Sequence, residues 1–198
     1  MDNFGESHRQ MRRRVLRAGV IASLFSFAGI ARAQSVQEQR DDVRATVNDT
    51  LNRLYSAQPS AKQAIAKAAG YGVFNDFGMK ILFAGGGTGK GLVVNNRTKK
   101  ETFMKMVEVQ AGLGLGVDKY RLVWVFERVA DLDQFINQGW ELGAQATVTA
   151  QVNGQGAQGF AGAMSITPGV WLYQLSEEGL AVDLTAKGTK YFRDDSLN

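Results

Sequence analysis

The stretch YGVFNDFGMKILFAGGGTGKGLVVN, residues 71–95, decides the fold class of this chain. Its apolar and polar residues alternate with a period of two, and glycine recurs every few positions. A period of two is typical of β-strands that bury one face. Because the pattern continues to residue 127, we expect several short strands, near 71–75, 79–85, 90–95, 101–110, 112–118 and 121–127.

Helical spacing replaces this alternation on the N-terminal side. Between residues 36 and 58, apolar residues recur at spacings of seven, four, four and three, which predicts one amphipathic helix that Pro59 ends. The apolar side chains of this helix are small, so we expect it to pack on the domain; insertion into a membrane interface is the alternative. Ser60 is expected to cap a second helix over 61–69, which Gly70 ends.

The C-terminal half predicts a return to strands. A short amphipathic helix is expected near 129–140, laid against the sheet, and the alternation over 143–153 predicts a strand. A glycine- and glutamine-rich loop follows over 153–162, and the chain ends in a hairpin of 170–175 with 180–186. The fold class is therefore α+β: a mostly antiparallel, strongly curved β-sheet or barrel-like sandwich with N-terminal helices and one short helix.

The first 33 residues predict a cleavable export signal. Four arginines between residues 12 and 17 precede an apolar run over 18–30, and Ala31-Arg32-Ala33 has the small-x-small pattern of a cleavage site. As a helix, the run is too short for a hydrocarbon core of ~30 Å. An uncleaved anchor helix is the alternative, and the general secretory and twin-arginine routes both stay open. We expect cleavage after Ala33 and a periplasmic or secreted protein, with or without membrane association.

Removal of this segment changes the composition. The full chain carries a net charge of +4, but residues 34–198 hold 17 basic and 17 acidic residues, so basicity gives no reason to expect a nucleic-acid partner. The chain has no cysteine, and its single histidine, His8, lies in the segment. Disulfides, zinc fingers, thiol catalysis and Ser-His-Asp chemistry are excluded for the remainder. We expect three parts: the signal over 1–33, a helix over 34–58 and one domain over 59–198.

Two glycine-rich motifs resemble nucleotide-binding loops. The block over 85–91, GGGTGKG, lacks the glycine five positions before its Gly-Lys pair and the Ser or Thr after Lys90, and a strand follows it instead of a helix. The GLGLG segment over 112–116 lacks the third glycine of a dinucleotide fingerprint. We interpret the first as a hairpin or bulge between two strands and the second as a structural segment between strands. No cofactor is expected.

Charge distribution is more informative than any catalytic motif. Six basic residues against one acid, Glu101, form a basic region, which consists of Lys80, Lys90, Arg97, Lys99, Lys100 and Lys105. Such a region attracts anionic lipid headgroups, although lysines also protect the edges of exposed strands. A hydrolase that uses only carboxylates would draw on Asp118, Glu141 and Asp183, although Asp118 and Glu141 also adjoin glycine turns.

From residue 66 to the C-terminus the chain resembles the SYLF lipid-binding domain family. Six blocks carry the resemblance in order: 66–74 (AKAAGYGVF), 85–94 (GGGTGKGLVV), 110–116 (QAGLGLG), 122–126 (LVWVF), 139–144 (GWELGA) and 171–180 (WLYQLSEEGL). The resemblance implies a binding module without enzymatic activity, whose eukaryotic relatives bind phosphoinositide membranes and, in some cases, actin. It also implies that Lys90 and its neighbour Lys80 contact lipid.

These observations lead to one hypothesis and one alternative. The first is an exported, non-enzymatic protein that contacts an anionic phospholipid or membrane surface through the basic region. The alternative is an envelope carrier or scaffold that holds an acyl chain or a protein partner, with room for a ligand beside the small side chains of Ala144, Ala146 and Ala150. Neither hypothesis specifies a lipid or a protein partner.

Overall fold

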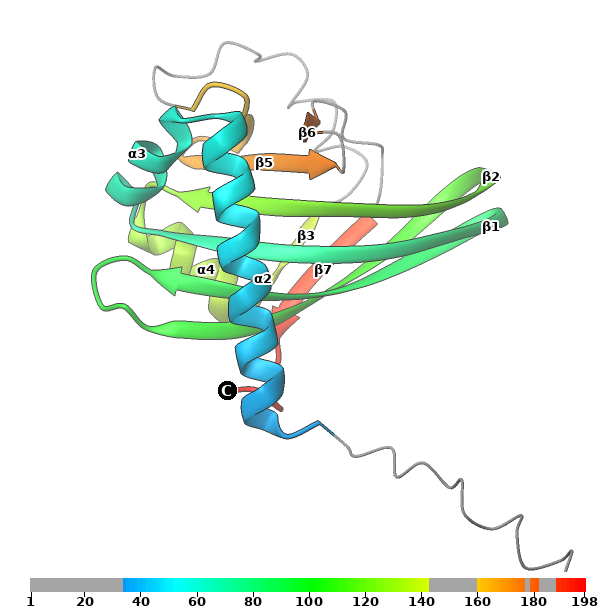
Figure 1. Cartoon of the computed structure of the whole chain (residues 1–198), viewed down its shortest axis with the longest axis horizontal. Coiled ribbons are helices and arrows are strands. Elements are labelled where there is room, and N and C mark those ends of the chain that lie inside the picture. The colour runs from blue at the N-terminus through cyan, green and yellow to red at the C-terminus, as the bar shows by residue number, and fades with distance from the viewer. Residues whose placement is uncertain (1–33, 143–159, 177–178, 182–187) are drawn as a thin grey trace, which may run out of the picture. The chain divides into compact units, whose positions relative to one another are not determined.

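A computed structural model describes residues 34–142, 160–176, 179–181 and 188–198. In Figure 1 an antiparallel, strongly curved β-sheet lies between helices, which confirms the expected α+β class. The predicted strand over 143–153, most of the predicted loop over 153–162 and the expected signal over 1–33 lie outside the described residues. Within the described part, no helix is long and apolar enough to cross a membrane.

Three helices match the predicted positions. Helix α2, Val36–Ala57, starts with a capping box: the Ser35 hydroxyl accepts from the Glu38 backbone, and the Glu38 carboxylate accepts from the Ser35 backbone. Helix α3, Ser60–Lys67, corrects two expectations, because Pro59 occupies its N-cap and Gly70 belongs to the following strand. Helix α4, Val129–Gln138, confirms the expected short helix.

The predicted short strands are in fact two long ones. Strand β1, Gly70–Asn95, and strand β2, Glu101–Phe126, each contain 26 residues and pair as one antiparallel hairpin. The expectation of breaks near 76–78, 86–89, 111 and 119–120 was therefore wrong. The glycine block over 85–91 lies inside β1 and forms no hairpin, and the GLGLG segment over 112–116 lies inside β2.

This two-stranded ribbon is folded back on itself. Its register shifts by one residue between Leu82 and Ala84, and beyond that point the second half of β1 returns beside the first (Figure 1). A hydrogen bond of 2.9 Å from the Asn96 backbone N–H to the Ala69 carbonyl joins the two ends of β1. One hairpin therefore supplies four neighbouring positions of the sheet.

Five shorter strands complete the described sheet, and β2 receives two of them along its outer edge. Strand β5, Val170–Ser176, pairs with one end of β2, and β7, Gly188–Arg193, pairs with the other. The edges are formed by β3, Trp140–Leu142; β4, Met164–Thr167; and β6, Gly179–Ala181. The β5–β6 pairing agrees with the predicted terminal hairpin, whereas β3, β4 and β7 were not predicted.

One face of the sheet is covered by α2 and α3. A buried row crosses this face, formed by Tyr173, Val123, Val73, Leu92 and Phe103. Helix α2 buries the apolar stripe read from the sequence against the row, through Val43, Val47, Leu51 and Leu54. The helix therefore packs on the domain, as expected for its small apolar side chains.

The opposite face carries an aromatic core under α4. The rings of Phe74, Trp124, Phe126, Phe135 and Tyr191 are buried; Trp124 and Phe126 are stacked, the other contacting pairs meet edge-on or tilted, and Trp140 lies at the margin. Glycines make room for this layer. A Cβ atom added to Gly91 would collide with the Phe74 ring and lie 2.5 Å from the Val73 carbonyl oxygen. The glycine block thus allows the halves of β1 to approach closely.

Candidate functional site

Three residues of the basic region lie in the turn that joins β1 to β2. The Asn95 side chain accepts from the backbone N–H groups of Arg97 and Thr98, both at 3.0 Å, and Lys99 has a positive φ of 60°. Arg97, Lys99 and Lys100 are all exposed. We call these three residues the cationic turn. Its backbone bonds hold the three charges at one end of the sheet.

The cationic turn is attached to the end of α3. The Asn96 side-chain amide donates to the carbonyls of Ile65, at 2.7 Å, and Ala68, at 2.9 Å. These bonds give partners to carbonyls at the end of the helix, where Ile65 has only a 3.3 Å bond from the Ala68 backbone N–H. They also bring the turn beside the last turn of α3, which carries exposed Lys67. Sequence reasoning missed Lys67, since it lies outside the basic region along the chain.

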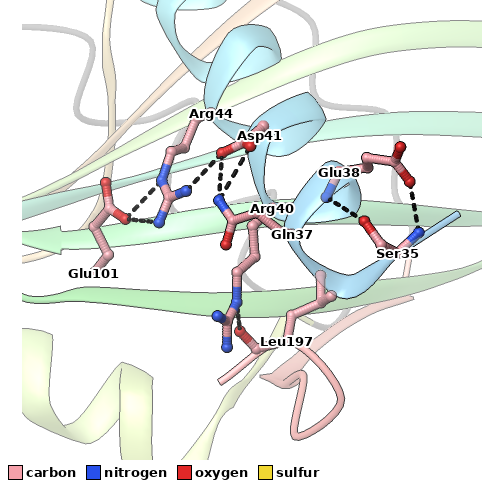
Figure 2. A network of polar contacts seen from close by, with 8 residues as sticks. All are labelled: Ser35, Gln37, Glu38, Arg40, Asp41, Arg44, Glu101 and Leu197. Carbon is pink, nitrogen blue, oxygen red and sulfur yellow. Dashed lines mark hydrogen bonds and ion pairs between the residues drawn. The ribbon is translucent and has the colours of Figure 1, made fainter.

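Glu101, the one acidic residue of the basic region, is bound by a helix arginine. Figure 2 shows Arg44 of α2 between Glu101 and Asp41, with Arg44 Nη2 2.8 Å from Glu101 Oε2. The hydrogen bond to Glu101 is the main reason that the pKa of Arg44 is raised. Arg44 also lies over the Phe103 ring, 5.3 Å from its centroid. Glu101 therefore helps to hold α2 on the sheet.

Two lysines of the basic region lie on the strands, where they face each other across the β1–β2 pair. Lys90 Nζ donates to Gln39 Oε1 of α2 at 3.2 Å, and Gln39 carries no charge. Lys105 Nζ lies 2.8 Å from Asp194 Oδ1, whose residue is 1% exposed. Burial alone would raise the pKa of Asp194, but bonds from Lys105 and Ser196 outweigh it and lower that pKa.

The strand lysines belong to an exposed surface that also carries apolar side chains. Cross-strand pairing places Phe192 opposite Lys105, and Val107 opposite both Thr88 and Lys190. Phe192 is 37% exposed and Val107 is 40% exposed. We call this surface the strand face; it consists of Thr88, Lys90, Lys105, Val107, Lys190 and Phe192. Sequence reasoning missed Phe192 and Lys190, because β7 was not predicted.

Lys80 lies apart from both groups. Its backbone pairs with Gly116, two residues before the register shift at the bend of the ribbon. At ~3.3 Å per residue, this position is roughly 35 Å along the strand from the level of the cationic turn. The basic region is therefore divided between a turn, a strand face and the bend.

A pocket of about 370 Å³ lies beside α3. It is lined by Ser60, Gln63, Ala64, Lys67, Ala68, Glu127 and Phe160. Phe160 stacks on Trp171 at a centroid distance of 4.6 Å, and the Trp171 indole N–H donates to Glu127 Oε2 at 3.2 Å. The pocket thus combines an apolar floor with one cation and one carboxylate.

No catalytic arrangement emerges in the part of the chain with described side chains. There, no three carboxylate or histidine side chains gather into a metal site. Of the three carboxylates considered for a hydrolase, Glu141 lies exposed on the short strand β3. The side chains of Asp118 and Asp183 lie outside the described residues.

An antiparallel sheet with exposed basic surfaces fits the class of binding domains, and comparison with known proteins agrees. Residues 107–198 match the model of the family Ysc84, described as "Las17-binding protein actin regulator". "Beta cell expansion factor A" of Aeromonas veronii is 33% identical over 164 residues, or 83% of this chain. The chain spans 60% of that relative's length. Ysc84 is the model of the SYLF family, so residues 107–198 match that family, and the resemblance read from the sequence is confirmed.

Proposed function

We propose that this chain is an exported lipid-binding protein that attaches to anionic phospholipid membranes through its basic surfaces. One observation carries the proposal. Five cations of the basic region have described side chains, and among these five only Lys105 forms an ion pair within the described structure. Glu101, the acid nearest to them in the sequence, is bound by Arg44 of α2 and pairs with none of the other four. The other four charges remain available to anionic headgroups, at ~1 kcal/mol for each well-placed cation.

Export would place these surfaces among the lipids of a bacterial envelope. The sequence of residues 1–33 supports this location, as argued from its arginines, its apolar run and its cleavage pattern. The family description refers to an actin regulator, and the relative's name refers to the expansion of beta cells. We assign neither activity to this chain, since the lipid surface is the partner that both the charge and the expected location favour.

Matched charge variants test the electrostatic part of this proposal. We expect the purified protein to co-sediment with phosphatidylglycerol-containing vesicles and to bind less as salt rises. One double variant changes Lys99 and Lys100 to glutamine and removes two charges from the cationic turn. A second changes Lys90 and Lys190 to glutamine and removes two charges from the strand face. A contacting pair should lose about 30-fold in affinity, the equivalent of ~2 kcal/mol. The control neutralises Arg53 and Lys62, two exposed helix cations, with an expected loss below about threefold.

Two results would contradict electrostatic membrane binding. One is vesicle binding by the wild-type protein that depends on neither salt nor anionic lipid. The other is an equal loss of binding in all three double variants, which would reflect net charge and no particular surface.

The pocket beside α3 supports a second candidate function, a carrier that holds one small amphipathic lipid. If a lipid occupies the pocket, native mass spectrometry of the purified protein should show a bound ligand at one per chain. Replacing Ala64, a buried pocket residue, by phenylalanine should remove that ligand, whereas the same change at exposed Ala45 on α2 should not. A ligand-free wild-type protein, or a ligand that survives Ala64→Phe, would exclude a carrier that uses this pocket.

A further inference from the structure

The strand face differs from the cationic turn in composition. It consists of two parallel rows of neighbouring side chains, Lys90–Lys105–Phe192 and Thr88–Val107–Lys190. Residues directly opposite each other in an antiparallel sheet have Cβ atoms roughly 4.5–5.5 Å apart, so each row is continuous. The strand face therefore combines lysines with two exposed apolar side chains, whereas the cationic turn offers only cations and a threonine.

Helix α2 separates the two surfaces. Its first half crosses the sheet between them: Arg44 binds Glu101 beside the cationic turn, and Gln39 binds Lys90 of the strand face. Helix α2 lies on the same sheet face as the strand face and is roughly 10 Å thick with its side chains, so a bilayer can reach the strand face only when tilted along one flank of α2, with the turn on the other flank. The two surfaces thus correspond to two different orientations on a membrane.

The chemistry of the strand face suits the boundary between headgroups and acyl chains. Lysine stems can lie along apolar surface while their ammonium groups reach phosphates, and an aromatic ring between them gains from leaving water. At the margin of the strand face, Glu141 of β3 is an acidic residue that lies opposite Lys190 of β7. The charge of Lys105 is balanced by buried Asp194, so this ion pair adds no net charge to the strand face.

We infer that the strand face is the surface that contacts the bilayer, with Phe192 and Val107 entering the interface and Lys90 and Lys190 binding anionic headgroups. This inference rests on the proposed function, since it specifies how the protein lies on the membrane. It makes the cationic turn a secondary source of attraction. A loss of apolar contact at Phe192 then weakens binding even where salt screens the charges.

Single-cysteine labelling tests the orientation directly, because the chain contains no cysteine of its own. An environment-sensitive fluorophore is placed on Phe192→Cys, on Arg97→Cys in the turn and on Arg53→Cys on the outer side of α2. With phosphatidylglycerol–phosphatidylethanolamine vesicles, we expect a blue shift and quenching by lipid-borne quenchers at position 192 alone. A shift at position 97 without one at 192 would overturn the inference in favour of the turn.

Equilibrium binding supplies an independent readout. Phe192→Ser should reduce affinity for the same vesicles roughly tenfold, and the reduction should persist at high salt because it removes apolar contact. The double neutralisation of Lys99 and Lys100 should have less effect than that of Lys90 and Lys190. An unchanged thermal midpoint of Phe192→Ser would show that its fold is intact, as expected for a side chain 37% exposed.

The outcomes separate this inference from the proposed function. If the wild-type protein binds no vesicles, the proposed function fails. If it binds and Phe192→Ser binds equally well, the inference alone fails. A second copy of the chain is the other occupant to test: a dimer in sedimentation equilibrium that Phe192→Ser converts to a monomer would also overturn the inference.

Discussion

Replacing Gly91 by alanine is expected to lower the free energy of unfolding by at least about 3 kcal/mol. The added Cβ would collide with the Phe74 ring and lie 2.5 Å from the Val73 carbonyl oxygen, so it meets both a side chain and the backbone. The Phe74 ring cannot simply move aside, because it packs edge-on against Tyr191 at 4.9 Å and Phe135 at 6.0 Å between centroids. Overpacking at such a position reaches or exceeds the usual range of 1–3 kcal/mol. Urea unfolding followed by circular dichroism measures the loss.

Two companion variants make the Gly91 result specific. Gly86→Ala lies in the same glycine block at an exposed position, where the nearest atom to its Cβ is the Glu108 carbonyl oxygen at 3.2 Å. It should cost less than about 1 kcal/mol. Adding Phe74→Leu to Gly91→Ala should recover part of the loss, because the two changes act on one contact. Equal costs for Gly86→Ala and Gly91→Ala would refute the packing explanation.

Replacing Asp194 by asparagine is expected to lower the free energy of unfolding by about 3 kcal/mol at neutral pH. The Asp194 carboxylate is buried and binds Lys105 at 2.8 Å, the Ser196 backbone at 3.1 Å and the Ser196 hydroxyl at 2.5 Å. Loss of a charged hydrogen bond at a buried site costs about 1.5–3 kcal/mol, and the asparagine amide can still form some of the three bonds. Urea unfolding of both proteins measures the difference.

The effect of Asp194→Asn should depend on pH in a defined direction. The pKa of Asp194 is lowered in the folded protein, so its stabilising effect is complete above the unfolded-state pKa of about 4. That contribution is lost as pH falls through the lower, folded-state pKa. The difference between wild type and variant should therefore be constant from about pH 5 to pH 8 and shrink below about pH 4. A difference that grows in acid would contradict the assignment.

Asp195→Asn serves as the control for this experiment. The Asp195 side chain is 92% exposed, and its contact with Arg193 spans 3.7 Å. Surface ion pairs of this kind contribute little, so the variant should stay within about 0.5 kcal/mol of wild type at every pH.

The elements that depend on local periodicity were predictable, and those that depend on distant partners were not. The stripe that includes Val43 and Leu54 identified α2, since an amphipathic helix carries its own pattern. The continuity of β1 was missed because Gly89 and Gly91 look like breaks in a sequence. Their role is seen only in the folded structure, where Met106 and Phe74 fill the space that a side chain at Gly89 or at Gly91 would need.

The same limit applies to the candidate site. The charges of Arg97, Lys99 and Lys100 adjoin one another in the sequence, so their grouping in a turn could be anticipated. The position of Phe192 opposite Lys105 could not be predicted, because β7 and β2 are separated by almost half the chain. No local pattern marks Asp194 as the partner of Lys105, since burial of a carboxylate after β7 depends on packing that the sequence alone does not display.

The folded ribbon also sets the order in which the sheet can assemble. Its first cross-strand pair, Val94 with Glu101, joins residues only seven positions apart, and each further pair extends the previous one toward Gly70 with Phe126. Closing such short loops costs little chain entropy, so the ribbon can zip outward from its turn as a contiguous nucleus. Strand β7 instead pairs with residues of β2 that lie 79 to 89 positions earlier in the chain. We therefore expect β7, with Asp194 over Lys105, to join the sheet after the ribbon has formed.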